Sequence, residues 1–112
     1  MTQFDDRERA QERKFVMEAE SAFKANARRA KLLGLWAAEL MGLDQATAKV
    51  YALDVVKSDL AEPGDEDIYR KVKGDLEEKG VEMSEHRLRR EMADFLEEAY
   101  RQVAGEAAKL PE

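Results

Sequence analysis

The sequence predicts an all-α protein, a four-helix bundle that follows a mobile, conditionally helical N-terminal arm. Three observations predict this fold class. Apolar residues recur at steps of three and four, glycine and proline punctuate the chain at three places, and no alternating run of strand length is present. The 112 residues suffice for one domain, and 44% hydrophobic with 39% charged residues is typical of helices with one buried stripe.

The first helical stretch is expected over residues 2–41. Thr2 and Asp5 have the spacing of a capping box, and Gly42 fits the position just after a helix end. The predicted buried face consists of Phe15, Ala19, Phe23, Ala27, Ala30, Leu33, Ala37 and Leu40. Because forty residues is long for a globular helix, we expect a break or fraying near residues 14–20.

The second and third helices are expected on either side of Pro63. Asp44 is a suitable N-cap for the second, whose apolar residues are Ala48, Tyr51, Ala52, Val55, Val56 and Leu60. The residue before a proline is disfavoured in a helix, so this helix stops by Glu62. The third begins after Gly64 and ends at Gly80, with a narrow apolar stripe formed by Ile68, Val72 and Leu76.

The fourth helix has the clearest apolar stripe. Ser84 is its predicted N-cap, and Met83 and Leu88 occupy the two positions of a hydrophobic staple. The stripe consists of Leu88, Met92, Phe95, Leu96, Ala99 and Val103. We expect Gly105 to weaken the end of this helix. Four amphipathic helices with short connections favour a bundle of antiparallel type.

Composition and charge restrict the function. The chain has no cysteine, no apolar leader and no apolar run long enough to cross a membrane, so we expect a soluble cytoplasmic protein without membrane insertion. The net charge of −6 argues against a nucleic-acid partner. Residues 1–31 hold six acids and eight bases, whereas residues 32–112 hold nineteen acids and eleven bases, an asymmetry that can mark a partner-binding segment.

Catalytic and metal-binding patterns are weak. The only histidine, His86, lies in a first helical turn and is expected on the surface. The acidic residues Asp59, Glu62, Asp65, Glu66 and Asp67 lack calcium-loop spacing, and turn and helix-cap chemistry explains them better. We therefore predict no enzyme, no metal and no cofactor.

A nucleotide-binding hypothesis stays open. Trp36 could stack on an adenine base while Arg28, Arg29 and Lys31 hold its phosphates. The competing interpretation is that Trp36 is a core residue. The spacing favours it, because Trp36 lies three residues after Leu33 and four before Leu40, on the apolar face. Gly34, close by, is expected to permit a close helix approach or a kink.

The N-terminal stretch MTQFDDRERAQERKF has little with which to contact a core. Oppositely charged side chains one helical turn apart, such as Asp5 and Arg9, stabilise a helix by about 0.2–0.5 kcal/mol for each pair. Like-charge pairs in the same stretch oppose this effect. Phe4 and Phe15 are eleven residues apart and would share a helix face. Two hypotheses remain: a solvated, frayed terminus, or an arm that folds on a partner.

Three segments, FDDRERAQERKF, FKANARRAKLLGLWAAELMG and DLAEPGDEDIYRKV, resemble the zeta subunit of alphaproteobacterial F-type ATP synthases, an inhibitor of ATP hydrolysis. The resemblance implies that residues 1–18 form an inhibitory arm, disordered or frayed when free, before a bundle over residues 19–105 and a frayed tail over 106–112. It also implies that the arm inserts as a helix between catalytic α and β subunits near the central shaft and blocks rotation.

Carried over by position, the inhibitory residues are Phe4, Asp5, Asp6, Arg7, Glu8, Arg9, Glu12, Lys14 and Phe15. The implied partners are the α, β and central-shaft subunits, with the chain in the cytoplasm and peripheral to the inner-membrane enzyme. Two alternatives remain: a helical bundle that binds ADP or ATP, and a generic protein-interaction scaffold.

Overall fold

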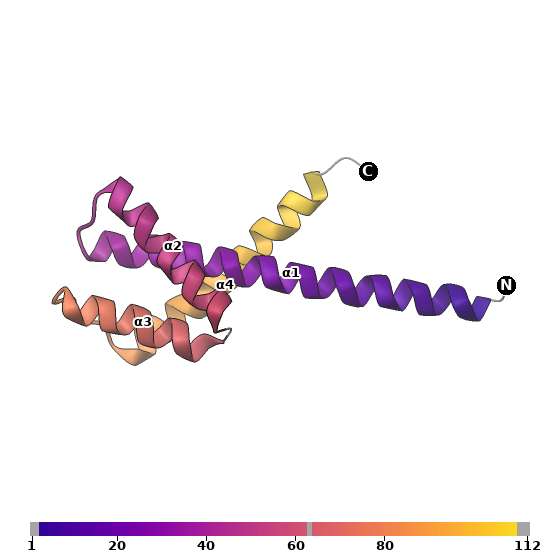
Figure 1. Ribbon diagram of the computed structural model, residues 1–112, viewed down its shortest axis with the longest axis horizontal. Coiled ribbons are helices and arrows are strands. Elements are labelled where there is room, and N and C mark those ends of the chain that lie inside the picture. The colour runs from indigo at the N-terminus through magenta and orange to yellow at the C-terminus, as the bar shows by residue number, and fades with distance from the viewer. Residues whose placement is uncertain (1–2, 63, 110–112) are drawn as a thin grey trace.

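The fold is all-α, as the sequence predicted. The computed structural model describes the backbone of residues 3–62 and 64–109 and the side chains of residues 18–62 and 64–107. The four helices are α1 (Gln3–Leu40), α2 (Gln45–Ala61), α3 (Asp65–Glu78) and α4 (Glu85–Lys109), and no strand occurs in the described ranges (Figure 1).

The helix ends follow the predicted capping residues. Gly42 adopts φ 76°, and the amide of Leu43 donates to the carbonyl of Ala38, so α1 ends in a Schellman motif. The Asp44 side chain accepts a hydrogen bond of 2.8 Å from the amide of Thr47 at the start of α2. This bond lowers the pKa of Asp44, because it stabilises the charged carboxylate.

The turn between α3 and α4 repeats the same chemistry. Gly80 has φ 75°, and the amide of Val81 donates to the carbonyl of Leu76. The Ser84 hydroxyl then accepts from the amide of Arg87 at 3.1 Å, which confirms Ser84 as the N-cap of α4. α4 continues through Gly105 to Lys109, so that glycine does not end the helix.

α1 is the central element and runs the length of the molecule, which measures 65 × 28 × 22 Å (Figure 1). It packs chiefly against α2 and α4, and α3 closes the bundle against the other three helices. The break expected near residues 14–20 is absent, because the helix is continuous from Gln3 to Leu40. Its N-terminal half extends away from the other helices.

The core lies between one side of the α1–α2 pair and the stripes of α3 and α4. Its buried members are Ala30, Leu33, Ala37, Val55, Ile68, Val72, Leu76, Met83, Leu88 and Met92. Both staple residues, Met83 and Leu88, belong to it. A smaller cluster of Ala25, Ala99 and Val103 joins α1 to the second half of α4.

Part of the predicted buried face of α1 is wrong. Phe23 and Leu40 are exposed, although helical spacing placed both on this face. Leu60, one of the apolar residues of α2, is exposed as well. Ala19 is also exposed. The periodicity identified apolar faces correctly, but it could not show which of them meet another helix of the same chain.

Gly34 allows α1 and α2 to touch. A Cβ atom at Gly34 would lie 2.7 Å from the Cα of Ala52, closer than two carbon atoms can approach. Of the two predicted roles for this glycine, the structure supports close helix approach, since α1 has no interruption there. Trp36 lies nearby, packed against the core, with its ring edge to face with Phe95 at a centroid distance of 6.1 Å.

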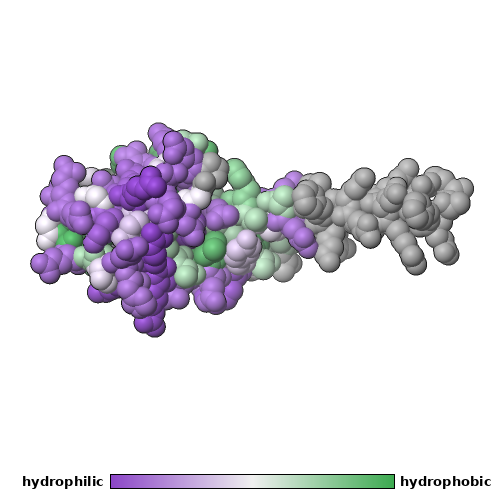
Figure 2. All heavy atoms as spheres, turned by 90° about the horizontal axis from the view of Figure 1, so that it is seen from below, coloured by the Kyte–Doolittle hydropathy of each residue, from purple (hydrophilic) through white to green (hydrophobic). Residues whose placement is uncertain are grey.

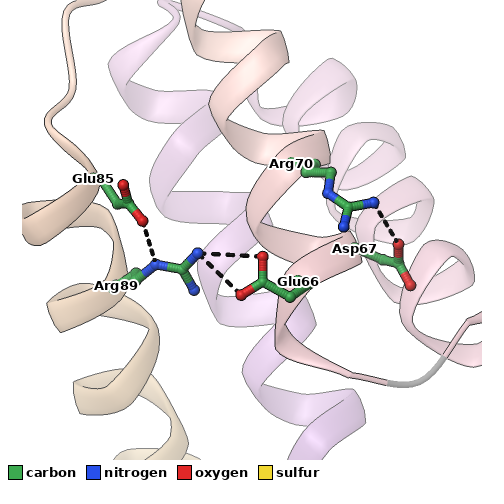
Figure 3. Close-up of polar contacts among 5 residues, drawn as sticks. All are labelled: Glu66, Asp67, Arg70, Glu85 and Arg89. Carbon is green, nitrogen blue, oxygen red and sulfur yellow. Dashed lines mark hydrogen bonds and ion pairs between the residues drawn. The ribbon is translucent and has the colours of Figure 1, made fainter.

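A surface network joins α3 to α4 (Figure 3). The Arg89 guanidinium contacts Glu85 on its own helix and Glu66 on α3, each at 3.0 Å, and it lies 4.1 Å from the ring centre of Tyr69. Arg70 pairs with Asp67 within α3 at 3.6 Å. Exposed pairs of this kind contribute about 0–1 kcal/mol each, so the network orients the helices more than it stabilises them.

Candidate functional site

The predicted arm lies in the N-terminal part of α1. The backbone of all nine predicted inhibitory residues is helical, but their side chains lie outside the described part of the structure: Phe4, Asp5, Asp6, Arg7, Glu8, Arg9, Glu12, Lys14 and Phe15. Met1 and Thr2, including the expected capping residue, lie outside the described backbone as well. The roles of these residues therefore stay predictions.

The junction between arm and bundle can be located by burial. The side chains of residues 18–20 are exposed, and the first buried side chain in the described range is that of Ala25. At 1.5 Å per residue, the helix between Gln3 and Ala25 is about 33 Å long. The boundaries predicted at residues 18 and 105 stay predictions, but α1 crosses the first of them without interruption.

The four residues of the nucleotide-binding hypothesis do not converge. Arg28 and Lys31 border a groove on the outer side of α1 and α2. Arg29, in contrast, is 2% exposed and pairs with Asp65. Trp36 packs against the core beside Phe95. The aromatic ring and the cations therefore face different parts of the molecule.

The buried Arg29 is the centre of a polar cluster where the α2–α3 turn meets α1. Its guanidinium donates to Asp65 at 2.7 Å and to Asn26 at 3.3 Å, while its Nε has no partner among the described residues. Asp59 at the end of α2 is 6% exposed and lines the same cavity, which has a volume of about 230 Å³. Burial raises the pKa of Asp59, the charge of Arg29 opposes this shift, and Asp65 adds to it.

Sequence reasoning missed this cluster. Arg29 pairs with a residue 36 positions away, and no local pattern indicates such a partner. One signal was present: Arg29 lies four residues after Ala25 and four before Leu33, and both of those side chains are fully buried. A charged residue at that position on the face needs a counter-charge within reach of its buried side chain.

The second feature that sequence reasoning missed is a groove between α1 and α2, with a volume of about 790 Å³. We call it the α1–α2 groove, and its lining residues are Phe23, Lys24, Ala27, Arg28, Lys31, Leu35, Lys49, Ala52, Leu53, Val56 and Glu106. The lining is mostly apolar, with basic side chains around it. Arg28 is fixed by an ion pair with Glu106 at 2.7 Å and a hydrogen bond to Gln102 at 2.8 Å.

Within the described residues, no group of three or more His, Asp or Glu side chains is arranged to hold a metal ion. None of the described helices combines the length and the apolar character needed to span a bilayer.

The geometry thus defines a small helical bundle whose central helix extends beyond its own core, an architecture suited to binding another protein. The comparisons agree with this class. Residues 1–102 match the family described as ATPase inhibitor subunit zeta, and the chain belongs to that family of inhibitor subunits. The match includes the whole predicted arm.

A solved structure has a similar fold. The fold is similar to a solution NMR structure of a protein that is 44% identical, with a TM-score of 0.65. The similarity covers 75% of this chain and 95% of that one. No curated protein sequence matches the chain.

Proposed function

We propose that this chain inhibits ATP hydrolysis by the F-type ATP synthase through its N-terminal segment. Residues 1–18 enter a catalytic α/β interface as a helix, close to the central shaft, and block rotation in the hydrolytic direction. The bundle stays outside, in the cytoplasm, peripheral to the membrane-bound enzyme. The family match over residues 1–102 supports the inhibitory role, since it includes this segment.

The continuity of α1 is the observation that carries the proposed mechanism. Starting an isolated helix is unfavourable, whereas extending an existing one adds a hydrogen bond for each residue fixed. The segment before residue 18 extends a helix that the bundle already holds at Ala25, Ala30 and Leu33. The partner therefore does not have to meet the cost of helix nucleation, although ordering each residue still costs about 1–2 kcal/mol.

The partner interface must offset that ordering cost. Two aromatic residues, Phe4 and Phe15, and several arginines are the residue types that dominate binding energy at protein interfaces. A cleft between two subunits can surround a helix and remove these side chains from water. The segment has few apolar residues with which to contact its own bundle, and in the insertion mechanism it buries them against the partner subunits.

Deletion of residues 1–14 tests this proposal. Full-length and truncated chains are titrated into the purified catalytic head of the cognate enzyme while ATP hydrolysis is followed. We expect the truncated chain to lose inhibition. Its melting temperature is expected to change little, because every buried side chain of α1 in the described range lies at Ala25 or beyond. Full inhibition by a folded, truncated chain would refute the mechanism.

A further inference from the structure

α2 carries apolar side chains on more than one side, and only some of them are covered by the other helices. Ala52 and Val55 are buried, whereas Leu53, which lines the α1–α2 groove, is 52% exposed. An amphipathic helix ordinarily buries its apolar side chains against another surface. The open side of α2 therefore has the composition of an interface without its partner.

The same open side continues onto α1. Phe23, which is 62% exposed, and Leu53 form the edges of the α1–α2 groove, while the partly buried Ala27, Leu35 and Val56 form its floor. Figure 2 shows apolar surface where α1 leaves the bundle, on a face that is otherwise largely hydrophilic. Covering such a strip releases about 25 cal/mol for each Å² of apolar surface.

The groove has a basic border on an acidic protein. Lys24, Lys31 and Lys49 line it, and among the described side chains they form no ion pair. Residues 18–31 hold two acids and four bases, whereas residues 1–17 hold four of each, so the positive excess near the N-terminus is located at the groove and at Arg29. The complementary ligand is apolar along its centre and carries carboxylates along its sides.

We propose that the α1–α2 groove docks an amphipathic helix of the ATPase head, whose apolar stripe lies between Phe23 and Leu53 and whose carboxylates face Lys24, Lys31 and Lys49. The identity of this partner rests on the proposed function. The groove begins eight residues after Phe15 on the same continuous helix, about 12 Å further along its axis. The bundle thereby attaches to the enzyme beside the point where the arm enters it.

A second copy of the chain suits the groove less well. The acidic helices α3 and α4 bury their own apolar stripes, including Ile68, Val72, Leu76, Leu88 and Met92, in the core. Neither helix, over its described side chains, offers a free stripe flanked by carboxylates. A small ligand on the floor would leave Phe23 and Leu53 in water, whereas a helix contacts both edges.

Binding of full-length variants to the purified, immobilised ATPase head tests the groove. Leu53→Glu places a carboxylate in the apolar strip, and we expect it to weaken binding by about tenfold or more, the loss typical of an interface anchor. Val50→Glu is the matched control, because it makes a similar change at an exposed apolar site of α2 that lies outside the groove. We expect its affinity to stay within about twofold of wild type.

The charge complementarity has its own readout. Lys49→Glu is expected to weaken binding and to reduce its dependence on salt concentration, whereas Lys57→Glu, on the same helix but outside the groove, changes neither. Three results would overturn the proposal. The first is equal affinity of Leu53→Glu and Val50→Glu for the head, and the second is self-association of the wild-type chain that Leu53→Glu abolishes. The third is that millimolar ATP binds in this groove and displaces the head.

An ATP hydrolysis assay on the same samples separates this proposal from the proposed function. If wild type inhibits and the groove variants bind like their controls, the groove proposal fails and the inhibitory function stands. If wild type binds through Leu53 and Lys49 but does not inhibit, the inhibitory function fails and the groove remains a docking site.

Discussion

The two sides of the α1–α2 pair have similar residue types and different environments. On one side, Leu33 and Val55 meet the stripes of α3 and α4 and are fully buried. On the other, Leu35, Leu53 and Val56 line an open groove. Apolar periodicity thus shows that a helix face is suited to packing. It does not show whether that face packs against another helix of the same chain or against another protein. The covered side should determine stability, and the open side should determine binding.

Truncating one leucine on each side gives the largest expected contrast. Leu33→Ala leaves a cavity in the core and is expected to lower the free energy of unfolding by about 2–5 kcal/mol. Leu53→Ala, at a half-exposed site, should change it by less than about 0.5 kcal/mol. Urea unfolding followed by far-UV circular dichroism measures both. Equal losses would mean that the groove is part of the core.

The second contrast tests the seam between the two sides. Gly34→Ala puts a Cβ atom 2.7 Å from the backbone of Ala52, so the helices must separate, at an expected cost of about 1–3 kcal/mol. Gly74→Ala is the control, because a Cβ at this position in α3 meets no atom within 4 Å. This second change should stabilise the protein by about 0.5–1 kcal/mol, since alanine is the better helix former.

These glycine variants are compared by their urea midpoints at constant pH. A Gly34→Ala protein as stable as wild type would show that α1 and α2 can separate without loss. That result would also weaken the distinction between the covered side and the open side of the α1–α2 pair.

Much of the fold could be predicted because its determinants are local. Asp44 and Ser84 cap the helices that they precede, and Gly42 and Gly80 end the preceding ones in left-handed turns. Steps of three and four also predicted the stripes of α3 and α4, since each of these helices has one apolar face and a single place to bury it.

The remainder depends on contacts between distant segments. Phe23 and Leu40 were assigned to the buried face of the first helix because their spacing is correct, yet both are exposed. The partner of Arg29 is 36 residues away, and the α1–α2 groove combines residues of three helices. For the candidate arm, the residues left two hypotheses open, a frayed terminus and a partner-binding segment, and family resemblance decided between them. The residues alone could not, because the surface that the segment would contact is not part of this chain.

The smallest expected effect concerns the polar edge of the covered side, at Asp59. Its pKa is raised, so the folded state binds this proton more tightly than the unfolded state does. The stabilising contribution is therefore complete below the ordinary carboxyl value of 3.8 and is lost as the pH rises through the raised value. Asp59→Asn cannot ionise, and its stability relative to wild type should rise across this window.

At neutral pH we expect Asp59→Asn to equal or exceed wild type by no more than about 1 kcal/mol, because desolvation of the carboxylate outweighs its attraction to Arg29. Asp65→Asn is the matched control, since it removes the carboxylate charge that pairs with the buried Arg29 guanidinium at 2.7 Å and should destabilise the protein. Urea unfolding between pH 4 and 7 measures all three proteins. A relative stability of Asp59→Asn that fell with pH would instead mean that Arg29 holds Asp59 as a net stabilising partner.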